Sequence, residues 1–230
     1  MTARESQATA YATLVADHAH ELEVRRSRFI AYLFRTDTED AARAALAGLR
    51  RQHHDARHHC TAFILGADRQ IQRSNDDGEP SGTAGVPMLE ALARRETPSG
   101  QTDLSDITAV VVRYFGGILL GAGGLVRAYS QSVSSALDGA RLIRRQRMAL
   151  LGIESSPADA GRLEHELRAQ GITVRGTEYG PDLATLQIAL PDAPDAVSAF
   201  GARLAALTSG SATAVPRGSA WVDTPFGTAP

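Results

Sequence analysis

The sequence contains no lysine, and this absence restricts its chemistry more than any other compositional feature. All 24 basic residues are arginine. Mechanisms that use a Schiff-base lysine, or the phosphate-binding lysine of a P-loop, are therefore excluded. Cysteine is nearly absent too, because Cys60 is the only one. A single cysteine cannot form an internal disulfide, which suits a cytoplasmic location.

Long apolar runs are also missing. No stretch approaches the roughly 18–20 apolar residues that span a bilayer, and we expect neither a secretory signal nor a membrane partner. Excess charge is missing as well. The formal net charge is −2, and the first 144 residues are balanced. A strongly basic nucleic-acid-binding domain would look different, so any contact with RNA would need a local patch of charge.

The composition that remains is that of a folded protein with a packed core. Hydrophobic residues make up 43% of the 230 residues, which is enough for two domains. Thr36–Glu39 has the pattern of a capping box that opens a helix. The near-continuous apolar run at 107–115 predicts a strand buried on both faces. In this half we predict strands at 21–34, 60–65 and 107–115, and helices at 40–54, 88–95 and 124–143.

The second half has a more regular pattern, with predicted caps at Ser156 and Asp192. The predicted order is β-α-β-β-α-β, the ferredoxin-like split unit. The arginine-rich segment 141–147 carries few core residues, so we place the boundary there, with domains 1–144 and 145–230. The predicted strands are 147–154, 171–180, 183–190 and 211–224, and the predicted helices are 158–170 and 193–208.

Residues 74–85, SNDDGEPSGTAG, form the first polar segment that suggests a site. Its acids could hold a divalent cation, but known cages place acidic ligands at alternating positions and these aspartates are adjacent. Its glycines and hydroxyls could instead present backbone N–H groups to an anion. An ordinary tight turn has the same composition. The candidate residues of this segment are Asp76, Asp77, Glu79, Ser81 and Thr83.

Residues 116–124, GGILLGAGG, follow a predicted strand and precede a helix, a position suited to binding phosphate. Neither nucleotide motif is complete, because no lysine follows Gly121 and a dinucleotide motif would need glycine in place of Val126. Arg113 and Arg127 flank this loop. A cation in a first helical turn opposes the helix dipole, so Arg127 indicates either an anionic partner or an ion pair with a loop acid.

Histidines crowd residues 53–59, next to Cys60. Zinc would need a second pair of ligands at a suitable spacing. Cys60 stands at the head of an apolar strand, which favours a buried small residue over a nucleophile. Neither G-x-S-x-G nor H-E-x-x-H occurs. We therefore predict no catalytic residues, no metal and no cofactor.

Four motifs together resemble those of the YigZ/Impact family. They are Glu23 with RSRFI (26–30), then His54-x-Ala56-x-His58-x-Cys60, then DDGEPSGTAG (76–85), then VVRYFGG…LGAGGLVRAY (111–129). The resemblance implies an α+β fold, in which residues 1–144 form an Impact-type domain resembling domain 2 of ribosomal protein S5. It implies that residues 145–230 form a ferredoxin-like domain, followed by an irregular tail, resembling domain V of elongation factor G.

The resemblance also implies a function, since eukaryotic relatives act in the regulation of translation. We expect a cytoplasmic, non-enzymatic regulator in which the two loops converge and bind RNA or a ribosome-associated protein. Alternatives are a phosphotransfer-type enzyme that uses the glycine-rich loop and the acids, and a scaffold whose loops serve only the fold. The expected binding residues are Arg28, His54, His58, Asp76, Asp77, Glu79, Ser81, Thr83, Arg113, Tyr114, Gly121, Gly123, Gly124 and Arg127.

The chain departs from the family pattern at two positions. Asn75 stands where the family usually has serine, and Leu119 stands where it commonly has lysine. The loss of that positive charge weakens the interpretation of the second loop as a phosphate site. Each lost phosphate contact lowers the slope of the logarithm of the binding constant against the logarithm of salt concentration by about 0.9.

Overall fold

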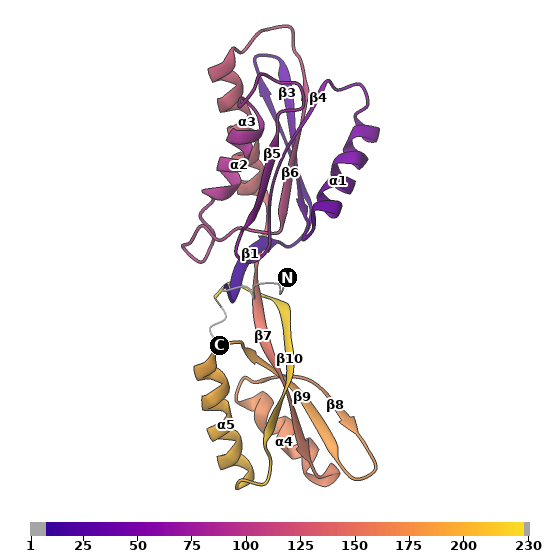
Figure 1. The fold of residues 1–230 in the computed structure, drawn as a ribbon, viewed down its shortest axis with the longest axis vertical. Helices are drawn as coiled ribbons and strands as arrows, with labels where there is room; N and C mark the ends of the chain where they lie inside the picture. Colours follow the sequence, from indigo (N-terminus) through magenta and orange to yellow (C-terminus); the bar gives the residue numbers. More distant parts are fainter. Residues whose placement is uncertain (1–7, 228–230) are drawn as a thin grey trace, which may run out of the picture. The chain divides into compact units, whose positions relative to one another are not determined.

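The computed structural model describes residues 8–227 and divides the chain into two compact units, Met1–Arg144 and Arg145–Pro230. This described part has a mixed α+β architecture with two antiparallel sheets and five helices (Figure 1). None of the helices it contains is long and apolar enough to cross a membrane.

Unit one is built on a sheet with the strand order β2-β3-β6-β4-β5. Helices α2 and α3 pack together on one face of this sheet, and α1 covers the other (Figure 1). Leu49 of α1 packs there against Ile30, Val110 and Val112. The elements are β1 (Ala10–Leu14), β2 (His18–Val24), β3 (Ser27–Arg35), α1 (Glu39–Gln52), β4 (His58–Leu65), β5 (Ile71–Asn75), α2 (Gly85–Ala93), β6 (Ile107–Tyr114) and α3 (Ala122–Gly139).

The central strand β6 is buried from Ile107 to Arg113, as the apolar run predicted. It pairs antiparallel with β3 on one side and β4 on the other, and helices cover both faces. Burial on both faces therefore arises here in an antiparallel sheet, although such runs are most typical of parallel ones.

The prediction of one strand over 21–34 is wrong, because the segment is a hairpin. Val24 of β2 pairs with Ser27 of β3, which leaves Arg25 and Arg26 as a two-residue loop. Both have positive φ, 48° and 63°. Two-residue hairpin turns with this geometry match the twist of the flanking strands, and they usually contain Asn-Gly. Two arginines carry none of the usual turn signals, so the sequence pattern concealed the turn.

Two predicted helix caps are also corrected. Helix α1 is capped by Thr38, whose side chain accepts a hydrogen bond from the Ala41 N–H. Thr36 is instead buried, and its hydroxyl bonds that of Thr108 at 2.6 Å. Asp192 does not cap the last helix either, because its carboxylate accepts from Arg147 Nε at 2.5 Å.

Unit two has the predicted β-α-β-β-α-β order, and its sheet places β10 beside β7, followed by β9 and β8. Its core joins Leu163 and Phe200 of the two helices to Leu186 and Ile188 of the sheet. Strand β7 begins at Leu142, so the boundary between the two units falls within this strand. The elements are β7 (Leu142–Ser155), α4 (Pro157–Ala169), β8 (Thr173–Tyr179), β9 (Ala184–Pro191), α5 (Pro194–Thr208) and β10 (Ala214–Thr224).

Candidate functional site

The polar motifs gather at one end of the unit-one sheet. Strand pairing places Arg28 opposite Tyr114, and His58 opposite Arg113. One end of the sheet therefore carries the start of β4, the end of β6 and the β2–β3 turn. It is the upper end of unit one in Figure 1. The loop between β6 and α3 extends from this end, and we refer to the region as the motif end.

Asp76 organises the acidic loop from within. Its carboxylate accepts hydrogen bonds from three backbone N–H groups, those of Gly82, Ala84 and Gly85, at 2.8–3.0 Å. Burial raises the pKa of this carboxyl, but the three N–H bonds outweigh that effect and lower it below its usual value. The backbone nest that the sequence suggested for an external anion is occupied by the chain's own aspartate.

Asp77 ties the same loop to β4 and α1. One carboxylate oxygen accepts from Arg50 at 2.7 Å, and the other accepts from the backbone N–H of His59 at 2.7 Å. Its carbonyl accepts from His58 Nδ1 at 2.9 Å. Asp77 has a φ of 43°, a left-handed conformation that aspartate tolerates better than most residues. This carboxylate, too, is engaged in holding the fold.

Glu79 makes the contact between the two motif segments. It is buried, and Oε1 accepts from Arg113 Nη1 at 2.6 Å and from the Tyr129 hydroxyl at 2.7 Å. The Arg113 guanidinium also lies over the rings of Phe29 and Phe115, 5.3 and 5.7 Å from their centroids. A buried ion pair is more favourable when additional hydrogen bonds satisfy the remaining lone pairs and protons of its two groups. The pair thereby joins the acidic loop to β6 and α3.

Cys60 lies beneath this pair and is inert. Its thiol donates to the Asp76 carbonyl at 3.0 Å and lies 3.4 Å from the Tyr129 hydroxyl. Burial raises the pKa of Cys60 to about 12, and burial likewise raises the pKa of Tyr129. A thiol with so high a pKa is not a nucleophile at neutral pH, in line with the sequence interpretation.

The glycine-rich loop is fixed at its base. A Cβ on Gly116 would overlap the backbone of Arg26, so the hairpin turn packs directly against this glycine. The Gly116 N–H also donates to Ser27 Oγ at 3.2 Å. At the other end of the loop, Gly121 has φ 71° and caps α3 without a side-chain hydrogen bond.

Arg127 lies exposed in the first turns of α3, and the described residues provide it with no ion pair. Of the two explanations that the sequence left open, an internal ion pair with a loop acid is therefore wrong. Arg25 and Arg26 are also exposed at the motif end, where Arg25 Nη1 donates to the Leu119 carbonyl at 3.4 Å. These two arginines were not among the candidate residues that the sequence motifs suggested.

A second network was also missed, on the α1 face of the sheet. The Tyr32 hydroxyl bonds His53 Nε2 at 2.8 Å, and His53 Nδ1 bonds the Tyr114 hydroxyl at 2.9 Å. Tyr114 donates in turn to Asp55 at 3.0 Å, so its hydroxyl oxygen is left to accept from His53 Nδ1. The sequence motif pointed to His54, which is exposed. The only sequence signal for His53 was its partner Tyr32, a polar-tipped residue within the apolar pattern of β3.

The other candidates are spread around this end. Arg28 pairs with Glu21 at 2.8 Å and lies over the Tyr114 ring, 5.4 Å from its centroid. Thr83 is buried and donates to the Pro80 carbonyl at 2.6 Å, whereas Ser81 is exposed. Gly123 and Gly124 form the first turn of α3.

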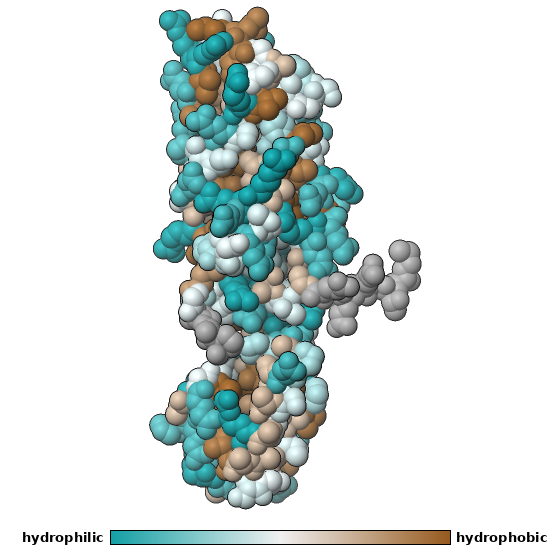
Figure 2. Space-filling model, turned by 90° about the vertical axis from the view of Figure 1, so that its left-hand side faces the viewer, coloured by the Kyte–Doolittle hydropathy of each residue, from teal (hydrophilic) through white to brown (hydrophobic). Residues whose placement is uncertain are grey.

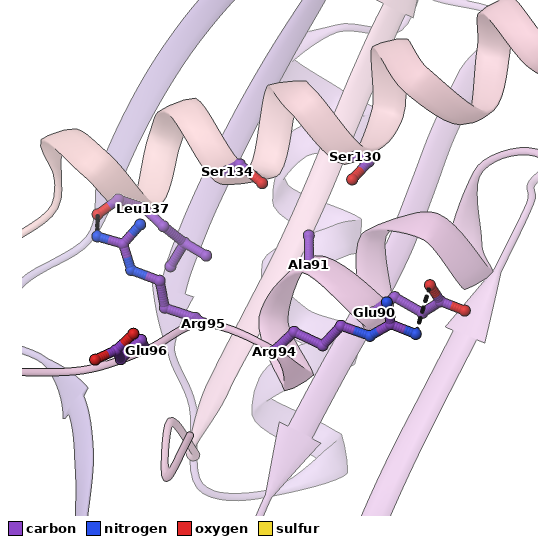
Figure 3. A pocket seen from close by; sticks show the side chains of 8 residues that line it. All are labelled: Glu90, Ala91, Arg94, Arg95, Glu96, Ser130, Ser134 and Leu137. Atoms are coloured by element: carbon purple, nitrogen blue, oxygen red, sulfur yellow. Dashed lines mark hydrogen bonds and ion pairs between the residues drawn. The ribbon is translucent and has the colours of Figure 1, made fainter. Parts of the chain in front are cut away.

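A groove of about 380 Å³ lies elsewhere on unit one, between the end of α2 and the middle of α3 (Figure 3). Arg94 pairs with Glu90 at 3.4 Å, and Arg95 donates to the Leu137 carbonyl at 3.3 Å. Ser130 and Ser134 line the opposite wall from α3. The two arginines are bonded to the chain itself, and no motif residue lines this groove.

The chain is similar to known proteins over both units. Residues 25–137 match the model of the Impact N-terminal domain, and residues 153–211 match a domain of unknown function (DUF1949). The chain is 42% identical to IMPACT family member YvyE of Bacillus subtilis over 75% of this chain and 76% of that one. It is 40% identical to IMPACT family member YigZ of Escherichia coli, over 82% and 89%.

The chain belongs to the Impact family. A solved structure described as a hypothetical protein is 38% identical to this Impact-family chain, with a TM-score of 0.58, and covers 90% of it. The match to the N-terminal domain includes every residue of the two converging loops, from Arg25 of the hairpin turn to Arg127 and Tyr129 of α3.

Proposed function

We propose that this Impact-family chain is a non-enzymatic, cytoplasmic regulator of translation that binds a ribosome-associated partner with the motif end of unit one. Family membership supports a regulatory role related to translation. We also infer the finer folds, an S5 domain 2-like unit one and a ferredoxin-like unit two. The β10-β7-β9-β8 order and the element order of unit two support the second assignment.

The observation that carries the proposal is the Arg25-Arg26 turn. A positive φ is unfavourable for side chains other than glycine, asparagine and aspartate, and two in succession cost of order 1–3 kcal/mol each. Asn-Gly would form this turn without that cost. A strained turn that keeps two exposed arginines indicates that their charge has a use outside the fold.

The local charge balance supports the same conclusion. Asp76, Asp77 and Glu79 each accept hydrogen bonds from donors within unit one, so their charge is compensated internally. The exposed guanidinium groups of Arg25, Arg26 and Arg127 are left facing solvent. A chain of net charge −2 thus presents a local cationic end suited to an anionic surface.

No specific observation favours the phosphotransfer alternative. The carboxylates that would hold magnesium are bonded to backbone N–H groups or arginine, and the Gly82 and Gly85 N–H groups that would hold phosphate donate to Asp76. The side chains that the motif end presents outward are its arginines, not these carboxylates.

Co-sedimentation with purified Escherichia coli ribosomes tests the proposal. We expect salt-sensitive co-sedimentation of the wild type. The double substitution Arg25→Asn, Arg26→Gly should raise stability while weakening binding about tenfold, equivalent to 1.4 kcal/mol. Arg127→Glu should weaken binding similarly. Arg94→Glu, at an exposed arginine by the groove of Figure 3, is the matched control and should bind as wild type. Absence of wild-type co-sedimentation would refute the proposal.

A further inference from the structure

Exposed apolar side chains concentrate at the motif end. Leu119 is 82% exposed, Phe115 48% and Ile118 39%, and all three belong to the loop between β6 and α3. We call these three residues the apolar tip. Val86 and Val126, in the first turns of α2 and α3, are exposed at the same end. Figure 2 shows apolar side chains at the upper end of unit one, among hydrophilic ones.

Resting on the proposed function, we propose that the partner bound here is a protein with an apolar groove rimmed by carboxylates, which the apolar tip enters. Leucine and isoleucine side chains cannot form hydrogen bonds with a phosphate or with the edge of a base. Their exposure is unfavourable in water and becomes favourable when a partner buries them, at roughly 25 cal/mol per Å². Exposed apolar side chains that gather in one loop, with polar residues around them, are a feature of protein interfaces.

The charges around the tip specify the rim of that groove. Residues 115–127 contain no acid, and Arg127 follows Val126 directly. Arg25 touches the tip through its bond to the Leu119 carbonyl. Phenylalanine and arginine are the residue types enriched in protein interfaces, where arginine pairs with carboxylates. An apolar centre flanked by arginines is therefore complementary to an apolar groove with an acidic border.

The tip is also pre-organised for docking. Gly116 packs on the hairpin turn, and Phe115 covers the Arg113 guanidinium, which is bonded to Glu79. A loop held at its base has less conformational freedom to lose when it binds, so more of the burial energy appears as affinity. The buried network beneath the site thus positions the exposed residues above it.

A pair of matched leucine substitutions tests the inference. Leu119→Ser should weaken co-sedimentation with purified Escherichia coli ribosomes about tenfold, which corresponds to 1.4 kcal/mol. Leu183→Ser removes a leucine that is 49% exposed in unit two and should leave binding unchanged. Both positions are exposed, and circular dichroism would verify that each variant folds.

Crosslinking then identifies the class of partner. With the photoreactive residue benzoylphenylalanine in place of Leu119, illumination on ribosomes should give a larger product on denaturing gels that persists after nuclease digestion. Collapse of that product under nuclease would identify RNA and overturn the inference. Wild-type co-sedimentation that Leu119→Ser does not weaken would overturn it as well, while leaving the proposed function standing. No wild-type co-sedimentation would overturn both.

Discussion

Glu79 and Arg113 form one buried ion pair that supports this site. Each belongs to a different motif, and each is buried, so neither charge can be compensated by water once its partner is removed. Tyr129 and Phe115 then depend on the same pair for their positions. The energetic consequence is much larger than for an ion pair at the surface.

Arg113→Met should lower the free energy of unfolding by about 3–5 kcal/mol, because it leaves the Glu79 carboxylate buried without its cation. Arg94→Met removes an arginine that is also paired, with Glu90, but at the surface; it should cost at most about 0.5 kcal/mol. Urea unfolding of both variants measures the difference. Equal losses would contradict the role given to the buried pair.

Asp76 makes stability depend on pH. Its pKa is lowered in the folded chain, so its contribution is fully present above the pKa of the unfolded chain and is lost as pH falls through the folded pKa. Asp76→Asn should cost about 1–3 kcal/mol at neutral pH, since three N–H donors lose a charged acceptor. Urea unfolding should show this difference shrinking as pH falls below the usual range of an aspartate carboxyl and through its lowered pKa in the folded chain. A difference independent of pH would show that the carboxylate charge is not what matters.

At the scale of elements, hydrophobic periodicity was informative where one pattern dominated. The buried run of β6 and the Ser156-Pro157 start of α4 appear as predicted. Caps and turns were less predictable, because several residues compete for one role and tertiary contacts decide between them. Thr36 lost the cap of α1 to Thr38 because a buried partner, Thr108, holds its hydroxyl.

The site was predictable in part, for a similar reason. The motifs named the acidic loop and Arg113, but not that the carboxylates face inward, since side-chain direction depends on the three-dimensional path of the loop. His53 was hidden because its partners Tyr32 and Tyr114 come from β3 and β6, which are neighbours in the sheet but far apart in the sequence. Arg25 and Arg26 were hidden inside what looked like one continuous strand.

Two glycines of the segment 116–124 should respond oppositely to alanine. Gly116→Ala places a methyl group in the backbone of the hairpin turn, and we expect a loss of about 1–3 kcal/mol from overpacking. Gly123→Ala meets open space in the first turn of α3 and should be neutral or stabilising by up to about 1 kcal/mol. Thermal unfolding compares them. A neutral Gly116→Ala would show that the hairpin turn yields easily.

At the scale of the whole chain, each unit has its own core and its own natural probe. Cys60, the only cysteine, lies in unit one, and Trp221, the only tryptophan, lies in β10 of unit two. Leu186→Ala removes a fully buried side chain from the core of unit two, and should cost that unit about 2–5 kcal/mol.

We expect Leu186→Ala to shift the urea transition followed by Trp221 fluorescence to lower concentration. The protection of Cys60 from a thiol reagent should not change, since the unit-one core is intact. Arg113→Met should do the reverse. Equal shifts of both probes in either variant would mean that the two units unfold as one.

The loop around Asp76 is a receptor whose ligand is covalently attached. Its three backbone donors converge on one carboxylate, and the aspartate is part of the same loop, so it binds them without a bimolecular association step. One substitution that removes this carboxylate would leave the three backbone donors without their acceptor. The loop would then need an external anion to regain the arrangement that Asp76 now holds.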